Sequence, residues 1–310
     1  MKNNEPIKQT QLFGLKKFFN ELILLDQKKN IPNKILLSGQ KGIGKSTMAY
    51  HLINYILSKD EDYSYDLNNL KINPENRSFK TLINKSNPNF TLIDISLDKK
   101  FIEINQIREM IINLNKSSFN DKPRFVLIDN IEYLNLNSVN ALLKILEEPS
   151  KNIFFILINN NKKILSTLSS RCINFKIFLT SKENMIVANE LLNNQLYNYI
   201  NEDIINHYST PGCIYNLILF AKENNYDLLN MSLDDLLKVI IKNKHYKKNV
   251  MIKNLFFDLI EFYFRTINVS LSQKIFDRYN YFLQRISETR RFNLDEDTLF
   301  IEIEKEISNG

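Results

Sequence analysis

The sequence of 310 residues contains no tryptophan, 6 glycines and 2 cysteines. The cysteines, Cys172 and Cys213, are isolated, and no CxxC pair exists. Structural zinc sites built from cysteine need such pairs, so we expect no zinc. Two isolated cysteines are typical of a protein kept in a reducing compartment.

Long apolar runs are also missing. The N-terminal segment MKNNEPIKQTQLFG has no hydrophobic stretch of signal-peptide length. No segment reaches the roughly 18 apolar residues of a membrane span. We therefore expect a soluble, cytoplasmic protein with no membrane partner. Its formal net charge of +6 is compatible with nucleic-acid contact, but a solvated surface explains so small an excess equally well.

The first half of the chain alternates short apolar runs with segments of helical spacing. The pattern predicts helices at 104–116 and 138–148, and strands at 34–38, 89–95, 124–128, 153–158 and 173–178. Nearly continuous apolar runs separated by helices are typical of a parallel sheet that is covered on both faces. The polar segment 58–86 is expected to hold one helix among loops.

Strand signals fade after about Thr180. Helical spacing is found in three segments, KENMIVANELLN, NEDIINHY and CIYNLILFAKENN. The tripeptide Thr210-Pro211-Gly212 separates the last two. We predict three domains: an α/β nucleotide-binding domain at 1–178, a small helical lid at 179–230 and an all-helical domain at 231–310. Within the last, Phe256, Phe257, Phe262, Tyr263 and Phe264 suggest helix packing rather than base stacking.

One motif carries specific chemistry. The stretch GQKGIGKS follows a predicted strand, opens a helix and matches G-x-x-x-x-G-K-[ST], the phosphate-binding P-loop. Backbone N–H groups of such a loop converge on phosphates, the lysine reaches the outer phosphates, and the Ser or Thr hydroxyl ligates Mg²⁺. The predicted ligands of ATP or ADP with Mg²⁺ are Gly39, Gln40, Lys41, Gly42, Ile43, Gly44, Lys45, Ser46 and Thr47.

A second strand ends in a carboxylate. Asp129 follows the apolar run FVLI, so with Ser46 it is a candidate for holding Mg²⁺ through the nucleotide. The next residue is Asn130. Its amide cannot take a proton from water and cannot serve as a general base. Glu132, two residues on, is a weaker candidate for that role.

Three further segments are distinctive: LFGLKKFF near the start, NALLKILEEP at 140–149, and Ser170-Arg171-Cys172. With the P-loop they make residues 12–178 resemble the AAA+ domain of bacterial clamp-loader subunits. The resemblance implies that Arg171 is an arginine finger acting on a neighbouring subunit's ATP. It also implies that Asn159 is the sensor-1 residue, although Asn159, Asn160 and Asn161 stand in a row. The competing interpretation of Arg171 is an ion pair with a local carboxylate.

Within that group the chain resembles the delta-prime type of DNA polymerase III more than the motor type. Asn130 stands where active members have Glu, and Cys213 stands where the lid motif S-P-G-R has Arg. The four-cysteine zinc module of many relatives is missing from 58–88. The resemblance implies a C-terminal collar, little hydrolysis, and partners that include delta and gamma/tau type subunits, the sliding clamp and primed DNA.

Two other functions stay open. The chain could be an active gamma/tau-like motor ATPase of the same loader, or a stand-alone AAA+ ATPase that remodels DNA as a homohexamer. The histidines His51, His207 and His245 have no metal-binding spacing and are expected at the surface or in packing. The basic run Lys242, Lys244, Lys247, Lys248 and Lys253 is either a solvated segment or an electrostatic contact.

Overall fold

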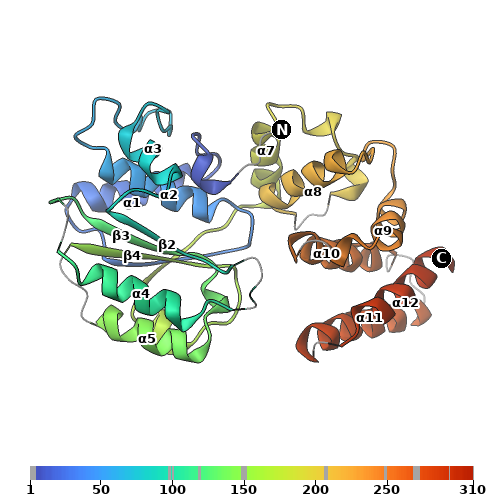
Figure 1. Cartoon of the computed structure of the whole chain (residues 1–310). Helices are drawn as coiled ribbons and strands as arrows, with labels where there is room; N and C mark the ends of the chain where they lie inside the picture. Colours follow the sequence, from blue (N-terminus) through green and yellow to red (C-terminus); the bar gives the residue numbers. More distant parts are fainter. Residues whose placement is uncertain are drawn as a thin grey trace. The chain divides into compact units, whose positions relative to one another are not determined.

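The computed structural model describes residues 5–96, 99, 101–117, 120–147, 152–205, 209–247, 250–267, 273–292 and 294–309. The chain divides into two compact units. Unit 1 is Met1–Val187 with Thr210–Gly212, and unit 2 is Ala188–Ser209 with Cys213–Gly310. Unit 1 is an α/β domain, and the described parts of unit 2 are helical (Figure 1). This confirms the predicted fold class. The separation of a lid at 179–230 from a collar at 231–310 stays a prediction.

The sheet of unit 1 has five parallel strands in the order β2-β3-β4-β1-β5. The strands are β1 (Lys34–Ser38), β2 (Phe90–Ile93), β3 (Arg124–Ile128), β4 (Ile153–Asn159) and β5 (Ile173–Lys176). The bounds of β1 and β3 are as predicted, and those of the other three strands differ by at most two residues at either end. Because all five run the same way, their carboxyl ends meet at one edge of the sheet.

Helices cover both faces of this sheet, as the near-continuous apolar strands require. Successive side chains point to opposite faces, so Leu37 and Leu127 join one buried cluster while Leu36 and Val126 join the other. The first face is covered by α1 (Lys16–Gln27), α2 (Lys45–Leu57) and α3 (Arg77–Ile83), and the second by α4 (Ile104–Leu114) and α5 (Leu136–Glu147) (Figure 1).

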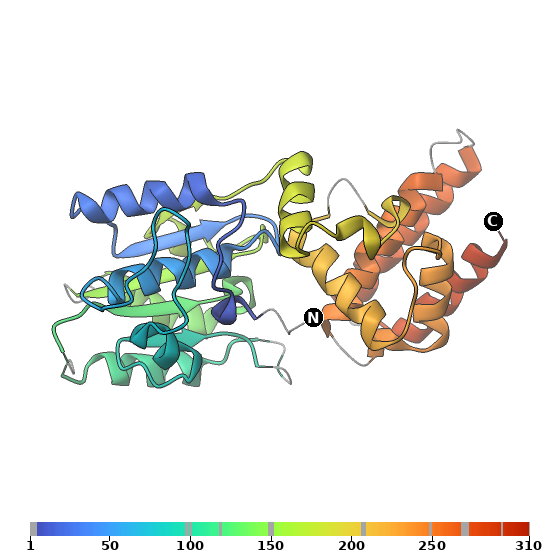
Figure 2. The ribbon, with the colours of Figure 1, turned by 90° about the horizontal axis from the view of Figure 1, so that it is seen from above.

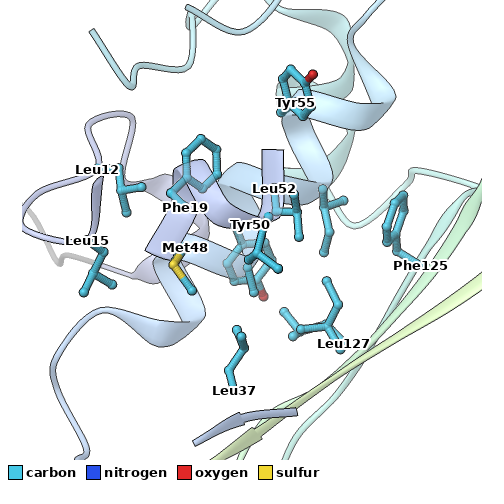
Figure 3. Packing of buried hydrophobic residues seen from close by; sticks show 14 of the residues in the cluster. Leu12, Leu15, Phe19, Leu37, Met48, Tyr50, Leu52, Tyr55, Phe125 and Leu127 are labelled. Carbon is cyan, nitrogen blue, oxygen red and sulfur yellow. The ribbon is translucent and has the colours of Figure 1, made fainter. Parts of the chain in front are cut away.

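Figure 3 shows the first of these clusters. Phe19 of α1 and Met48 and Leu52 of α2 lie above Leu37 and Leu127 of the sheet, and all are fully or almost fully buried. Removing a large side chain from such a cluster costs about 2–5 kcal/mol of stability, because neighbouring atoms fill the space only in part. This packing holds α2, and with it the loop that precedes α2, on the sheet.

The polar segment 58–86 folds around one buried side chain, Asn76. Its Oδ1 accepts from the backbone N–H of Phe79 at 2.7 Å and so caps α3, and its Nδ2 donates to the Tyr63 carbonyl at 2.7 Å. Oδ1 also accepts from Asn54 Nδ2 of α2 at 3.0 Å. One amide therefore ties the predicted helix of this segment to the core.

Unit 2 differs from the prediction in one place. NEDIINHY was expected to be a helix, but its described part holds only a short 3-10 turn, Glu202–Ile204, and residues 206–208 lie outside the described chain. The Asn201 side chain accepts from Asp203 N at 3.1 Å and favours a turn over a longer helix. The helix α8 (Pro211–Glu223) begins at the predicted break, because proline suits the first turn of a helix.

The remaining helices of unit 2 are α9 (Leu233–Lys242), α10 (Val250–Ile267), α11 (Gln273–Phe292) and α12 (Glu296–Asn309), drawn in orange to red in Figure 2. The predicted aromatic packing is confirmed: the Phe300 ring centroid lies 4.0 Å from that of Tyr246 and 5.0 Å from that of Phe256. Of the basic run, Lys247 pairs with Asp297, and Lys253 pairs with Glu296 at 2.9 Å. Lys248 lies outside the described residues. None of the described helices is long and apolar enough to cross a membrane.

His51, on α2, is completely buried rather than at the surface. Its Nε2 lies 3.0 Å from the Gln9 carbonyl, which can only accept, so Nε2 carries the hydrogen. Nδ1 then accepts from the Tyr65 hydroxyl at 2.8 Å. Burial lowers the pKa of His51 to about 4, outweighing the bond to Gln9, which raises it.

This histidine should make unit 1 sensitive to acid. The unfolded side chain has a pKa near 6.5, so the stability linked to neutral His51 is present above about pH 6.5 and is lost as the pH falls towards 4. We expect His51 to account for about 3 kcal/mol of stability lost over that window. Urea unfolding at pH 7.5, 6 and 5 would show a shallower decline for His51→Gln than for the native chain. Parallel declines would contradict the assignment.

Candidate nucleotide-binding site

The P-loop connects β1 to α2 at the carboxyl edge of the sheet, as the sequence predicts. Gly42 and Gly44 have φ angles of 85° and 96°, a backbone conformation that residues other than glycine rarely adopt. At Gly39, an added Cβ would lie 2.2 Å from the Ile177 carbonyl oxygen. The glycines are therefore required by the backbone path itself, and that path aims the N-terminus of α2 at the loop's interior.

Lys45, the first residue of α2, is buried beneath this loop, with 3% of its surface exposed. Its Nζ donates to the carbonyls of Gly39 at 2.9 Å and Gln40 at 2.6 Å, and to Asn160 Oδ1 at 2.9 Å. These three bonds use every hydrogen of the ammonium group. Burial lowers the pKa of Lys45 to about 8, while the charges of Asp129 and Glu132 oppose that change.

Ser46 and Asp129 meet across the site, with Oγ donating to Oδ2 at 2.5 Å. Burial raises the pKa of Asp129, and the bond from Ser46 opposes that rise. A hydroxyl and a carboxylate are oxygen ligands of the kind that Mg²⁺ prefers. Within the described parts of the chain, no group of three or more His, Cys, Asp or Glu is arranged to hold a metal ion. Phosphate oxygens would have to complete such a coordination shell.

Asn130 has left-handed backbone geometry, with φ 55° and ψ 46°. Asparagine tolerates this conformation better than glutamate does. The Asn130 side chain donates through Nδ2 to Asp94 Oδ1 at 2.8 Å and accepts through Oδ1 from Asn160 Nδ2 at 2.8 Å. Asp94, the first residue after β2, was not identified from the sequence. Its place beside Asn130 depends on β2 and β3 being neighbours, which no local pattern reveals.

Of the three consecutive asparagines, Asn160 is the one that contacts Lys45. The side chain of Asn159 turns into the following loop, where Nδ2 donates to the Lys162 carbonyl at 2.9 Å. Glu132 also reaches the cluster, because its Oε1 accepts from Asn160 Nδ2 at 3.0 Å. The strand β4 extends one residue past its predicted end, so Asn159 is its last residue and Asn160 is the first residue after it.

The residues Thr210 and Gly212 close the outer side of the P-loop and belong to the same unit. Thr210 Oγ1 donates to the Lys41 carbonyl, and the Gly212 N–H donates to the Gly42 carbonyl, both at 2.8 Å. An added Cβ at Gly212 would lie 2.9 Å from Gly42 Cα. The segment that the sequence identifies as a lid motif thus contacts the P-loop directly.

Arg171 lies at the opposite edge of the sheet from the P-loop. It precedes β5, whose Ile173 pairs with Ile35 near the start of β1. Its guanidinium donates to Glu147 Oε1 at 2.5 Å and to the Thr167 carbonyl at 2.9 Å. The local ion pair of the competing interpretation is therefore present, and the role of Arg171 as an arginine finger stays a prediction. The adjoining residues Glu148 and Pro149 of NALLKILEEP lie outside the described chain.

Known proteins with similar sequences include DNA polymerase III subunits. A "DNA polymerase III subunit delta'" of Buchnera aphidicola subsp. Baizongia pistaciae is 31% identical over 166 residues, covering 50% of this chain and 46% of that protein. The chain thus spans about half the length of this relative. A second "DNA polymerase III subunit delta'", from Buchnera aphidicola subsp. Acyrthosiphon pisum, is 26% identical over 296 residues, covering 85% of this chain and 83% of the relative.

Among solved structures, a DNA polymerase III gamma subunit-related protein of Thermotoga maritima matches 92% of this chain and 98% of its own, with a TM-score of 0.52 and 17% identity. That likeness concerns the fold alone. The family model described as "DNA polymerase III, delta subunit" matches residues 14–180, which include the P-loop, Asp129 and Arg171. The chain belongs to this DNA polymerase III subunit family, within which it is of the delta-prime type.

Proposed function

We propose that the chain is a delta-prime-like subunit of a bacterial clamp loader, which uses ATP to place the sliding clamp on primed DNA. It would work beside delta and gamma/tau type subunits. Family membership supports this assignment. One observation carries its mechanism: Arg171 and the P-loop lie at opposite edges of one sheet.

The separation follows from strand geometry. Arg171 lies level with the residues that precede β1, whereas the P-loop begins after Ser38. At about 3.3 Å per residue these two levels are roughly 20 Å apart. Arg171 therefore cannot reach a nucleotide held by its own P-loop, but it can serve a nucleotide on a neighbouring subunit. There its guanidinium would stabilise the charge that develops on the transferred phosphate.

The ion pair with Glu147 does not prevent this role. The Arg171 side chain is 32% exposed and that of Glu147 is 54% exposed. Ion pairs that are this exposed to water stabilise a protein by at most about 1 kcal/mol. Phosphates of a neighbour's nucleotide, with higher charge density, would compete successfully for the guanidinium.

The chain's own site is proposed to bind ATP or ADP and to hydrolyse little. Residues 39–47 would hold the phosphates, and Ser46 and Asp129 would hold Mg²⁺ bound to the nucleotide. The side chain at position 130 is an amide already bonded on both sides, so it supplies no general base. We further propose that 179–230 form the lid and 231–310 the collar through which the subunits assemble.

Nucleotide affinity should decline in alkaline solution. The pKa of Lys45 in the free chain is about 8, and bound phosphates raise it, so binding above pH 8 requires uptake of a proton. A fluorescent ATP analogue titrated with Mg²⁺ should bind roughly tenfold more weakly at pH 9.5 than at pH 7.5. In Lys41→Met the decline in affinity should persist but begin at a higher pH, because the charge of Lys41 helps to lower the pKa of Lys45. An affinity that does not change over the range would contradict the role of Lys45.

The arginine finger can be tested in a reconstituted clamp-loader complex. Arg171→Ala in this chain alone should slow hydrolysis at the neighbouring site by roughly a thousandfold. The DNA-stimulated hydrolysis rate of the complex should then fall by the amount that this site contributes. Gel filtration should show that the complex still assembles. Arg108→Ala, an exposed arginine on α4, is the matched control. If complexes with Arg171→Ala and with Arg108→Ala hydrolyse ATP at equal rates, Arg171 does not act on the neighbouring subunit's nucleotide.

One observation favours the motor alternative. Glu132 lies within the cluster, bonded to the amide that contacts Lys45, so a carboxylate is available near the phosphates. If it acts as the base, the purified chain should hydrolyse ATP, and Glu132→Gln should reduce the rate by about 100-fold or more. We expect the purified chain to show no hydrolysis above a Lys45→Met control. Brisk turnover that depends on Glu132 would replace the proposed function by the motor function.

A further inference from the structure

Four side chains at the carboxyl edge of the sheet form one continuous series of hydrogen bonds. Lys45 Nζ donates to Asn160 Oδ1 at 2.9 Å, Asn160 Nδ2 donates to Asn130 Oδ1 at 2.8 Å, and Asn130 Nδ2 donates to Asp94 Oδ1 at 2.8 Å. We name this series, from Lys45 through Asn160 and Asn130 to Asp94, the amide relay.

The relay follows the order of the strands. Asp94 comes directly after β2, Asn130 two residues after β3, Asn160 directly after β4, and Lys45 after the loop that leaves β1. The sheet order is β2-β3-β4-β1, so each member is bonded to the member on the neighbouring strand. The relay therefore crosses the sheet edge from an exterior strand to the P-loop.

Charge fixes the direction of every bond in the relay. One end is an ammonium group, which can only donate, and the other is a carboxylate, which accepts when ionised. A residue between them must accept on one side and donate on the other, and an amide does both. Glutamate at position 130 could not donate to Asp94 and would bring two carboxylates together. The relay thus gives a physical reason for the amide at a position where a general base would otherwise be expected.

The two members of the relay nearest the P-loop also use all their donor hydrogens within the protein. All three hydrogens of Lys45 are bonded. Asn160 Nδ2 uses its two hydrogens on Asn130 and Glu132. The buried polar side-chain atoms without a partner in the described residues belong to other parts of the chain, on Asn54, Ser58, Asn184 and Arg285. A phosphate that binds Lys45 must therefore replace one of these three bonds.

We propose that Asp94 and Asn130 are positioning residues that hold Lys45 in a resting arrangement, so that a nucleotide binds only by breaking the amide relay. This inference rests on the proposed nucleotide site. A phosphate that takes a hydrogen of Lys45 from Asn160 leaves the Asn160 carbonyl without its donor, which carries a free-energy penalty. The carboxylate of Asp94, acting through two polarised amides, strengthens the bond that must be broken.

The decisive variant is Asn130→Gly in the full chain. It breaks the relay without changing the charge, and glycine accepts the left-handed backbone at this position. The relay predicts that a fluorescent ATP analogue with Mg²⁺ binds this variant at least threefold more tightly than the native chain at pH 7.5. A purely structural role for Asn130 would lower the melting temperature and leave the dissociation constant unchanged or weaker.

Charge must be separated from hydrogen bonding. Asp94→Asn and Glu132→Gln each remove one negative charge near the site and keep an acceptor oxygen. Simple repulsion of the phosphates by carboxylates predicts similar tightening in both and no change in Asn130→Gly. The relay predicts tightening in Asn130→Gly, and no further gain when Asp94→Ala is added to it, because Asp94 is connected to Asn160 and Lys45 only through the Asn130 side chain.

The outcomes separate the two proposals. If the native chain binds the analogue, Lys45→Met does not, and Asn130→Gly binds as the native chain does, the nucleotide site stands and the relay is overturned. If neither the native chain nor Asn130→Gly binds, both proposals are overturned. Binding by Asn130→Gly that is tighter than native binding, or that appears where the native chain shows none, supports the relay.

Discussion

The parallel pairing of β1 between β4 and β5 is the constraint on which the rest of unit 1 depends. Parallel strands deliver every carboxyl end to the same edge, and so the P-loop, Asp129 and Asn160 meet although they are far apart along the chain. Without that pairing, the loop would have glycines and a lysine but no carboxylate opposite Ser46. The buried apolar faces of α2 and α5 pack on opposite faces of the sheet and hold its strands together.

The same constraint decides which parts of the site a sequence can reveal. The P-loop is local: a strand, glycines and a lysine in order, all predicted with their roles. The sequence signal for Asp129 is also nearly local, because this residue directly follows an apolar run. Asp94 carries no such signal, and its contact with Asn130 arises only once β2 lies beside β3. Asn159 and Asn160 are adjacent residues of one type, and only the structure shows that Asn160 is the one that turns towards Lys45.

The elements of the fold show a related limit. The central strands β1, β3 and β4 were predicted because each is an apolar run, and the structure buries most of their residues. The edge strand β5 is mostly exposed, although its sequence also alternates apolar residues. The segment NEDIINHY has helical spacing, yet its described part forms only a turn, since an asparagine side chain satisfies the backbone there. His51 was expected in packing or at the surface, and only the tertiary structure supplies the carbonyl and hydroxyl that keep it buried and neutral.

The contact of Gly212 with Gly42 determines how late during synthesis the nucleotide site can be completed. The hydrogen bond from Thr210 to the Lys41 carbonyl joins residues 169 positions apart. The residues 188–209, which begin within α7 (Ser181–Leu191), belong to the other unit. A chain leaving the ribosome can form the sheet and the P-loop early. The outer carbonyls of that loop stay solvated until the segment 210–212 has emerged, so the nucleotide site acquires its final form only after about two thirds of the chain has been synthesised.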